Sequence, residues 1–487
     1  MLKVLFASPE VVPFAKTGGL ADVAGSLPAA LKNLGCDVRV IMPFYKMVEP
    51  AAKERKLLAE NIEIPVGNKI YTGDIWEAAP GGAVPVYLIK CDEFFDRSSL
   101  YGTAKGDYRD NAERFIFFSR CALECCINID FAPDIIHCHD WQVGLIPAYL
   151  KTLYSAERHF KRTGTVFTIH NIAYQGVFER EAFKLTGLPE SIFTIDGLEY
   201  YGQMCFLKSA LMFSDIINTV SKKYSEEIQT PEYGYGMEGI LMRRKNDLYG
   251  IINGVDYAEW SPETDTYTSA HYSAVDLKGK QACKQDLLKE YGLPDSLGSR
   301  PILGVISRLA DQKGFNLLAD IMDELMAMDL GFVLLGNGEQ KYHDLFERIA
   351  RQYPKKAGIK IAYNNTLAHK IEAGSDMFLM PSRYEPCGLN QIYSLKYATV
   401  PIVRATGGLD DTIVDYNEAD ASGNGFKFTD YTARAFMRSI QRALKLFEDK
   451  KKWQKLMQNC MSYDFSWKQS AMQYVELYKK AMTKRGV

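Results

Sequence analysis

Runs rich in valine and isoleucine recur along the chain, separated by segments in which apolar residues follow helical spacing. This alternation is typical of parallel strands joined by crossover helices, so it predicts an α/β fold. In the first half we expect strands at residues 3–8, 38–42, 84–89, 135–137, 166–169 and 216–220. In the second half we expect them at 302–307, 332–335, 377–380 and 400–403.

The same pattern predicts two domains. A chain of 487 residues exceeds what one hydrophobic core usually serves, about 250–300 residues. Residues 249–265 mix Gly, Asn, Asp, Trp and Pro, which is typical of an interdomain passage. We therefore expect an N-terminal domain over 1–258 and a second α/β domain over 259–460. The periodic segment 461–487 is expected to form a C-terminal helix that packs back on the first domain.

Composition narrows the classes of protein. Lys plus Arg (58) nearly cancel Asp plus Glu (60), which leaves a formal charge of −2 and no long basic run for a phosphate backbone. We therefore expect no nucleic-acid partner. No leader segment or membrane-length apolar stretch is apparent, so we expect no membrane association and a cytoplasmic location. The ten cysteines are scattered and are expected to be buried thiols.

Two nearly identical glycine loops follow strands, one in each half. Thr17-Gly18-Gly19-Leu20 follows the first strand, and Thr406-Gly407-Gly408-Leu409 follows a late strand of the second half. Paired glycines let backbone N–H groups approach a ligand, and a helix starting after them adds unsatisfied donors. Because ligands of open α/β sheets bind beyond the carboxyl ends of the strands, both loops predict contacts to phosphate or sugar hydroxyls.

Basic residues accompany these loops. Arg308 and Lys313 leave a strand-to-helix loop of the second half, and Lys16 occupies the corresponding loop of the first. Fixed cations stabilise the negative charge that develops when a sugar–diphosphate bond breaks, which is a role that a bound metal could otherwise fill. We therefore predict a nucleotide-sugar transferase with no metal and no cofactor.

Several segments together resemble bacterial glycogen synthases and plant starch synthases. They span almost the whole chain in family order: Lys16-Thr17-Gly18-Gly19-Leu20, residues 108–115, His137-Cys138-His139-Asp140-Trp141, residues 168–176, Asn253-Gly254-Val255-Asp256, Ser307-Arg308-Leu309 and residues 381–389. The resemblance implies a GT-B fold, in which two Rossmann-like domains with parallel sheets face a deep interdomain cleft. It also implies a metal-independent, retaining transfer of glucose from ADP-glucose to the non-reducing end of an α-1,4-glucan such as glycogen.

The resemblance also implies residue roles. The catalytic set is Lys16, Asp140, His170, Arg308, Lys313 and Glu385. The donor is expected to contact Lys16, Gly18, Gly19, Asn253, Arg308, Lys313, Tyr363, Glu385, Cys387, Gly388, Leu389, Thr406, Gly407 and Gly408, with Tyr363 against the adenine. Tyr101, Asp140 and Trp141 are expected on the acceptor side. Many GT-B enzymes carry a second Glu eight positions after the first, but this chain has Tyr393 there.

Alternatives remain at this point. His137, His139, Asp140 and His170 are residue types that ligate zinc or iron, although we expect His137 and His139 to point to opposite sides of one strand. Glu385 and Asp140 could form a glycosidase-like pair. An NAD-dependent oxidoreductase is disfavoured because the first loop lacks G-x-G-x-x-G spacing. A UDP-glucose-dependent synthase and a catalytically inactive glucan-binding scaffold both remain open, as does the oligomeric state.

Overall fold

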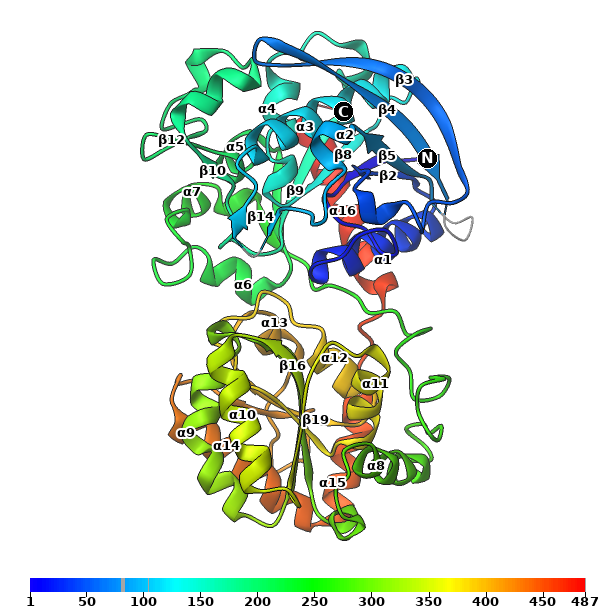
Figure 1. The fold of residues 1–487 in the computed structure, drawn as a ribbon, viewed down its shortest axis with the longest axis vertical. Helices are drawn as coiled ribbons and strands as arrows, with labels where there is room; N and C mark the ends of the chain where they lie inside the picture. Colours follow the sequence, from blue (N-terminus) through cyan, green and yellow to red (C-terminus); the bar gives the residue numbers. More distant parts are fainter. Residues whose placement is uncertain (80–83, 104, 487) are drawn as a thin grey trace. The chain divides into compact units, whose positions relative to one another are not determined.

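The computed structural model describes residues 1–79, 84–103 and 105–486. It divides into two compact units (Figure 1). Unit 1 contains residues 1–220, 225–254 and 467–487, and unit 2 contains residues 221–224 and 255–466. The chain thus passes from unit 1 to unit 2 at residues 254–255, four residues before the boundary expected from the sequence, and returns to unit 1 at residue 467.

Unit 1 is built on a nine-stranded sheet with the order β14-β13-β9-β8-β1-β2-β5-β4-β3. All neighbours from β14 to β5 pair in parallel, whereas β4 and β3 add an antiparallel ribbon at one edge. The strands are β1 (Lys3–Ala7), β2 (Asp37–Pro43), β3 (Arg55–Val66), β4 (Lys69–Ala78), β5 (Val86–Lys90), β8 (Ile135–His139), β9 (Gly164–Ile169), β13 (Ile216–Thr219) and β14 (Leu248–Gly250).

Helices cover both faces of this sheet, as continuous burial of its central strands requires. Residues of β8, β9 and β13 are buried throughout, which explains their runs of apolar residues. The helices are α1 (Gly19–Asn33), α2 (Asp92–Phe95), α3 (Asn111–Asn128), α4 (Ile146–Lys151), α5 (Phe206–Phe213), α6 (Lys222–Glu227), α7 (Glu238–Arg243) and α16 (Trp467–Lys484). Of these, α6 begins in the short segment assigned to unit 2. Small sheets join β10 (Val177–Phe178), β11 (Glu199–Tyr200) and β12 (Gln203–Cys205), and β6 (Gly102–Thr103) with β7 (Gly106–Asp107).

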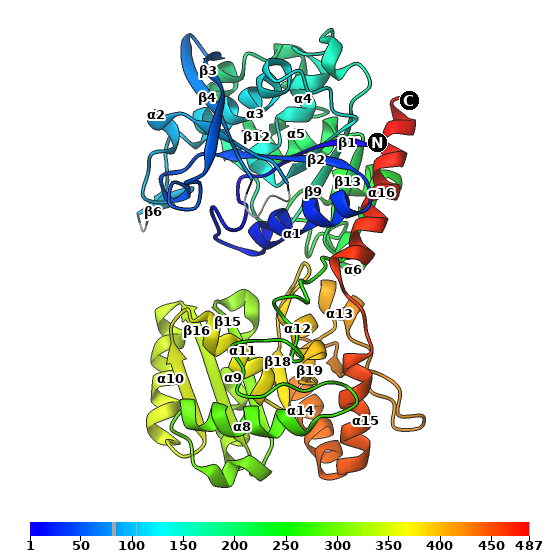
Figure 2. The ribbon, with the colours of Figure 1, turned by 90° about the vertical axis from the view of Figure 1, so that its right-hand side faces the viewer.

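The C-terminal helix α16 belongs to unit 1 and packs against α1 and the strands β8, β9 and β13 (Figure 2). Two buried tyrosines fasten it to the sheet. The Tyr478 hydroxyl lies 2.8 Å from Nδ1 of His137, and the Tyr474 hydroxyl accepts a hydrogen bond of 3.0 Å from the Asn218 amide. The last segment of the chain therefore completes the core of the first unit.

Unit 2 is built on a six-stranded, all-parallel sheet with the order β17-β16-β15-β18-β19-β20. The strands are β15 (Ile302–Leu309), β16 (Gly331–Gly338), β17 (Ala357–Ile361), β18 (Met377–Met380), β19 (Val400–Arg404) and β20 (Phe426–Phe428). The helices are α8 (Lys278–Glu290), α9 (Phe315–Ala327), α10 (Gln340–Gln352), α11 (Asn365–Gly374), α12 (Asn390–Lys396), α13 (Gly407–Thr412), α14 (Ala433–Glu448) and α15 (Lys450–Met461).

Two apolar layers sandwich this second sheet. The larger layer includes Leu318 and Phe436 and packs α9, α10, α14 and α15 against the strands. The smaller one includes Leu287 and Ile371 and packs α8 and α11. Helices on both faces of a parallel sheet make each unit Rossmann-like, which confirms the predicted α/β class.

All ten strands expected from the sequence are present, with bounds shifted by a few residues. The sequence analysis missed the long antiparallel ribbon of β3 and β4, whose register shifts twice near Ala59. Each such shift moves side chains to the other face, so no simple alternation marks these strands.

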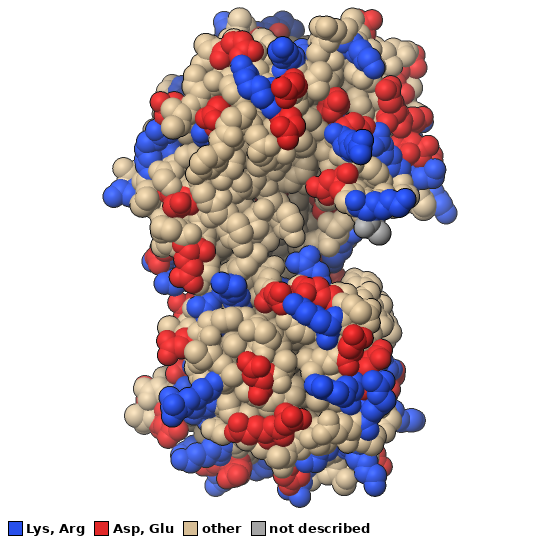
Figure 3. Space-filling model, turned by 60° about the vertical axis from the view of Figure 1, so that its left-hand side comes forward, with Lys and Arg blue, Asp and Glu red and all other residues tan. Residues whose placement is uncertain are grey.

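Surface charge and cysteine placement agree with the composition. On the face that Figure 3 shows, basic and acidic side chains are interspersed over both units. The ten cysteines are buried thiols. Within the described residues, no helix combines the length and apolar character needed to span a membrane.

Candidate active site

In unit 2, the predicted cations lie where β15 ends. Arg308 is the penultimate residue of this strand, and Lys313 closes a short 3-10 turn before α9. Gly314 follows with a φ of 76°, and a Cβ there would lie 1.9 Å from the carbonyl oxygen of Pro381. Only glycine fits such a close backbone approach. The loop that carries the cations is therefore pinned to the segment after β18.

That segment supplies the partner of Lys313. Its ammonium lies 2.6 Å from Oε2 of Glu385, and the Ser382 hydroxyl donates to the same oxygen over 3.0 Å. Glu385 is 6% exposed, whereas Arg308 is exposed. Gln312 links the two segments, since its amide donates to the Tyr384 carbonyl. The structure thus brings the sequence-predicted residues Lys313 and Glu385 into direct contact and places Arg308 on the strand end that leads into the same loop.

The second glycine loop packs onto the same acidic residue. The N–H of Gly408 donates to the carbonyl of Glu385 over 3.1 Å. A Cβ at Gly407 would lie 2.0 Å from that carbonyl oxygen, and one at Gly408 would lie 2.0 Å from the carbonyl oxygen of Cys387. Thr406 and Cys387 are buried around this contact. These glycines therefore allow two backbone segments to touch, and the Gly408 N–H is engaged within the chain.

The remaining donor-side predictions of unit 2 follow other strands of the same parallel sheet. Gly388 has a φ of 70° and, with Leu389, leads into α12. Tyr363 follows β17 and is 83% exposed, so one ring face is open to a ligand. Tyr393, which replaces the second Glu, stacks on Trp260 at a ring-centroid distance of 4.0 Å and an interplanar angle of 10°. Its ring is therefore held by packing.

In unit 1, Asp140 follows β8 in a backbone conformation that side-chain-bearing residues rarely adopt, with a φ of 59° and a ψ of 177°. Such strain of about 1–3 kcal/mol persists only where the surroundings enforce it and is common at functional sites. The Asp140 carboxylate accepts the backbone N–H of His170 over 2.8 Å. Burial raises the pKa of Asp140 to about 7, and the nearby Glu10 charge acts in the same direction. The Asp140 carboxyl therefore changes its protonation state near neutral pH.

His170 is paired with His139, which the sequence analysis had weighed only as a metal ligand. Nδ1 of His139 lies 2.9 Å from Nε2 of His170, because β8 and β9 pair with His139 opposite Thr168. Burial lowers the pKa of His170 to about 3 and that of His139 well below its usual range. Both imidazoles are neutral at pH 7. One nitrogen of the His139–His170 contact must donate, so the contact couples their tautomers.

The expectation that His137 and His139 point to opposite sides was wrong. Residues two apart on a strand share a face, and the two ring centroids lie 3.9 Å apart. His137 instead bonds Tyr478 and Thr168. Across the described ranges, no three His, Cys, Asp or Glu side chains gather as a metal ion would require.

Glu10 organises the first glycine loop and was missed by the sequence analysis. Its buried carboxylate accepts the Thr17 N–H (2.5 Å), the Gly18 N–H (3.3 Å) and the Tyr101 hydroxyl (2.7 Å). The structure thereby joins two predicted regions, the Gly18-Gly19 loop and Tyr101. Lys16 precedes the loop, is 43% exposed in its side chain, and pairs with Asp22 over 2.7 Å.

The glycines of this first loop make no contact that demands glycine. A Cβ at Gly18 or Gly19 would meet no described atom of the chain within 4 Å. Both residues are exposed. The open space beside the backbone is what close approach by a ligand requires.

Two further predicted residues are buried. Trp141 is 9% exposed and packs among Phe115, Phe178 and Phe206, so its ring contributes to the core of unit 1. Asn253 is 5% exposed, and its side-chain oxygen lacks a hydrogen-bond partner among the described residues. Their predicted contacts with acceptor and donor stay predictions.

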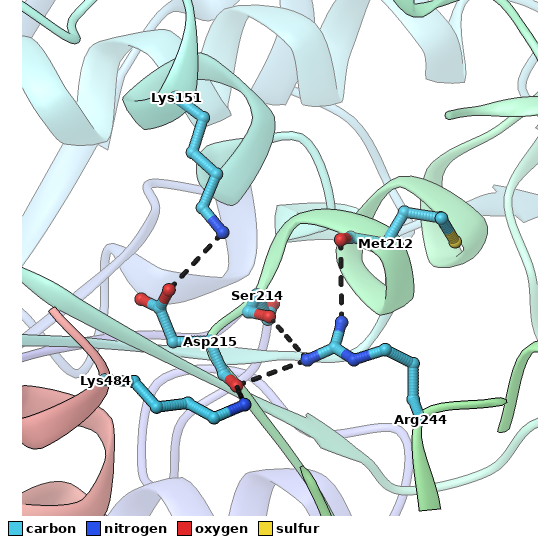
Figure 4. Close-up of a pocket in the computed structure, with 6 residues that line it drawn as sticks. All are labelled: Lys151, Met212, Ser214, Asp215, Arg244 and Lys484. Carbon is cyan, nitrogen blue, oxygen red and sulfur yellow. Dashed lines mark hydrogen bonds and ion pairs between the residues drawn. The ribbon is translucent and has the colours of Figure 1, made fainter. Parts of the chain in front are cut away.

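A separate cavity of about 360 Å³ lies in unit 1 (Figure 4). Its cations are engaged within the chain: Lys151 pairs with the Asp215 carboxylate over 3.3 Å, and the guanidinium of Arg244 donates to the carbonyls of Ser214 and Asp215. Lys484 of α16 also donates to the Asp215 carbonyl. The Lys484 contact joins the end of α16 to the segment that leads into β13. The cavity is lined by Lys151, Met212, Ser214, Asp215, Arg244 and Lys484.

Comparison with protein families divides the chain as the structure does. Residues 3–243 match the model of the starch synthase catalytic domain, and residues 294–459 match that of glycosyl transferases group 1. The chain is 49% identical over 480 residues to a glycogen synthase of Koribacter versatilis, covering 99% of this chain and 98% of that protein. It is 46% identical to glycogen synthase 2 of Geobacter sulfurreducens, with full coverage of both.

Solved structures give the same result. The catalytic domain of starch synthase IV from Arabidopsis thaliana, bound to ADP and acarbose, superposes with a TM-score of 0.90 at 34% identity and covers 99% of each chain. Sucrose-phosphate synthase from Thermosynechococcus elongatus matches with a TM-score of 0.60 at 15% identity, covering 99% of this chain and all of that one. The latter likeness concerns the fold alone.

Proposed function

The chain belongs to the family of bacterial glycogen synthases and starch synthases, which are glycosyltransferases of the GT-B fold, and on that premise we propose its donor, its acceptor and the roles of its residues. The donor is ADP-glucose. Glucose passes with retention of configuration to the non-reducing end of an α-1,4-glucan, and ADP is released. The residues that we assign to the reacting groups are Asp140, His170, Arg308, Lys313 and Glu385.

The observation that carries this proposal is the pinned cation loop of unit 2. Lys313 is held by the buried Glu385, and Arg308 lies exposed on the same loop. Both leave the carboxyl end of a parallel strand, where ligands of such sheets bind. We assign the two cations to the diphosphate, whose negative charge grows as the bond to the anomeric carbon breaks. Glu385 positions Lys313 and binds a glucose hydroxyl.

The choice of ADP rests on the base. The Arabidopsis starch synthase, which is 34% identical, carries ADP. In this chain the exposed ring of Tyr363 follows β17 at the same edge of the unit 2 sheet and offers a flat apolar face for adenine. Tyr393 takes the place of the second acidic residue, and its phenol is of a type that can hydrogen-bond to the ribose.

Unit 1 supplies the acceptor side. His170 is neutral at pH 7 because its pKa lies near 3, so it places no positive charge beside an anomeric carbon that itself becomes cationic. Its neighbour Asp140 accepts a hydrogen bond from the acceptor. We favour front-face attack, in which the leaving diphosphate removes the proton of the acceptor hydroxyl and no covalent glucosyl enzyme forms. Lys16, Gly18 and Gly19 bind the donor.

The test is release of ADP from ADP-glucose with and without glycogen, repeated with UDP-glucose. We expect release only with ADP-glucose and glycogen together, and retention at the new linkage by proton NMR. Release of UDP from UDP-glucose with a kcat/KM equal to that for ADP-glucose would contradict the assignment of ADP-glucose as the donor. Glycogen binding with no nucleotide release from either donor would identify a scaffold and refute the proposed activity.

A further inference from the structure

Two exposed tyrosines of unit 1 adopt the left-handed backbone conformation. Tyr201 has a φ of 49° and Tyr235 a φ of 51°, and each is followed by a glycine with positive φ, Gly202 at 81° and Gly236 at 83°. Tyr201-Gly202 is the two-residue turn of the hairpin between β11 and β12. Tyr235-Gly236 is the centre of a turn closed by Met237 N–H donating to the Gly234 carbonyl over 2.9 Å.

Tyrosine is an unfavourable residue at these positions. Turns with two positive φ values favour Asn-Gly or Asp-Gly, since a Cβ on a bulky residue crowds the backbone there. Burial does not offset this strain, because Tyr201 is 83% exposed and Tyr235 is 43% exposed. A strained, solvent-facing ring repeated in two separate turns points to a role in binding.

The two turns adjoin. The Tyr200 hydroxyl donates to the carbonyl of Tyr235 over 3.2 Å, and the rings of Tyr200 and Tyr201 lie 4.7 Å apart. The Gln175 amide donates to the same Tyr235 carbonyl over 2.9 Å, which brings in the neighbouring Tyr174, 53% exposed. Three adjoining loops thus carry Tyr174, Tyr200, Tyr201 and Tyr235, which we call the tyrosine platform.

The surroundings of the tyrosine platform favour a neutral ligand. Glu199, Gln203 and Glu238 lie on or beside the two turns, and Glu199 accepts the Gly202 N–H. The adjacent cations are already paired: Lys208 donates to the Glu199 carbonyl, and Arg243 binds Asp196 over 2.7 Å. Among the described residues beside the two turns, Lys208 is buried and Arg243 is paired, so a phosphorylated ligand would meet little accessible positive charge, whereas amide and carboxylate oxygens suit hydroxyl donors.

We propose that the tyrosine platform binds an α-glucan chain of the acceptor polymer through ring faces stacked on the apolar C–H faces of glucose units. This rests on the proposed function, since that function makes the glucan the substrate. The platform residues are distinct from Asp140 and His170, which act at the reacting end. The platform holds the polymer, so it raises affinity for long glucans and leaves transfer to short ones unaffected.

Substitution by asparagine separates binding from folding. Tyr201→Asn and Tyr235→Asn remove the ring and supply a residue that tolerates positive φ. We expect each to weaken glycogen binding in affinity electrophoresis roughly fivefold, the size of a lost aromatic contact, and to raise Tm by roughly 2 °C. Tyr201→Phe, which keeps the ring and the strain, is the matched control and should retain glycogen affinity and Tm.

The acceptor series distinguishes this idea from the proposed function. With ADP-glucose and maltotriose, kcat and KM of the asparagine variants should match the parent enzyme, while KM for glycogen rises. Unchanged glycogen affinity in the variant that combines Tyr201→Asn and Tyr235→Asn would overturn the proposal. A change of oligomeric state in light scattering, with no change in glycogen binding, would overturn it as well. A parent enzyme that transfers to neither acceptor would instead refute the proposed function.

Discussion

The two glycine loops have almost the same sequence and differ in what surrounds them. Gly407 and Gly408 are buried against the backbone of residues 385–387, whereas Gly18 and Gly19 are exposed beside open space. The first loop is held from the side by the Glu10 carboxylate, and the second is held by direct backbone contact. One motif thus serves chain packing in unit 2 and leaves room for a ligand in unit 1. A motif alone does not tell these roles apart.

The lysine beside each glycine loop has a different ion-pair partner, and the largest effect is expected at one of these lysines. Lys313 pairs with a buried carboxylate, whereas Lys16 pairs with the partly exposed Asp22. We expect Lys313→Ala to lower kcat about a hundredfold or more, as loss of a transition-state charge stabiliser does. Initial rates of ADP release measure this. Lys452→Ala, at an exposed lysine on α15, is the control and should keep the parent rate. If the Lys313→Ala enzyme keeps the parental kcat, Lys313 does not stabilise the leaving diphosphate and its assigned role is wrong.

The glycines themselves provide a matched pair. Gly408→Ala places a methyl group 2.0 Å from the Cys387 carbonyl, where neither backbone can yield, so we expect a loss of about 3 kcal/mol in the free energy of unfolding of unit 2. Gly18→Ala meets no described atom and should change unfolding by less than about 0.5 kcal/mol, yet raise KM for the donor. Urea denaturation and steady-state kinetics measure the two effects. Equal destabilisation by both substitutions would erase the distinction between the loops.

Sequence patterns predicted the parts of the molecule that depend on local order. Buried parallel strands are continuous apolar runs, so their positions and the two-sheet architecture were predictable. The loop carrying Arg308 and Lys313 was predictable as well, because it directly follows a strand and precedes a helix. The structure adds that Lys313 and Glu385, 72 residues apart, form one ion pair.

Other parts depend on contacts that no local pattern encodes. Glu10 is one of 60 acidic residues, and its role arises only when Thr17 and Tyr101 fold around it. The His139–His170 contact requires the pairing of β8 with β9. Trp141 was predicted on the acceptor side from its motif, but its burial among other aromatic rings became visible only in three dimensions.

The buried carboxyl of Asp140, which lies near Glu10 of the first loop, can be tested by its effect on stability at different pH values. Its folded-state pKa of about 7 exceeds its ordinary value of 3.8, so the carboxyl is most favourable to folding below pH 4 and becomes unfavourable as pH rises to 7. Asp140→Asn does not titrate. The unfolding free energy of this variant should therefore gain on the parent by about 3 kcal/mol between pH 4 and 7, then level off. Urea titrations at several pH values measure this, with the exposed Asp320→Asn as control. A pH-independent difference would show that the pKa of Asp140 is the same in the folded and unfolded states.

Glu10→Gln has the smallest expected effect and tests how the first loop is held. The amide offers one acceptor oxygen where the carboxylate offers two, so it cannot hold Thr17, Gly18 and Tyr101 together. We expect kcat/KM with glycogen to fall about tenfold, the effect of a misplaced binding loop. Because the Glu10 charge raises the pKa of Asp140, the pH at which Asp140→Asn stops gaining stability should also move below 7 in the Glu10→Gln background. Glu49→Gln, an exposed partner of Arg55, is the control for loss of an acidic charge. A fall in kcat/KM without that shift in pH would assign Glu10 to the loop alone, and a Glu10→Gln enzyme with both properties unchanged would mean that the first loop, like the second, is held by its backbone.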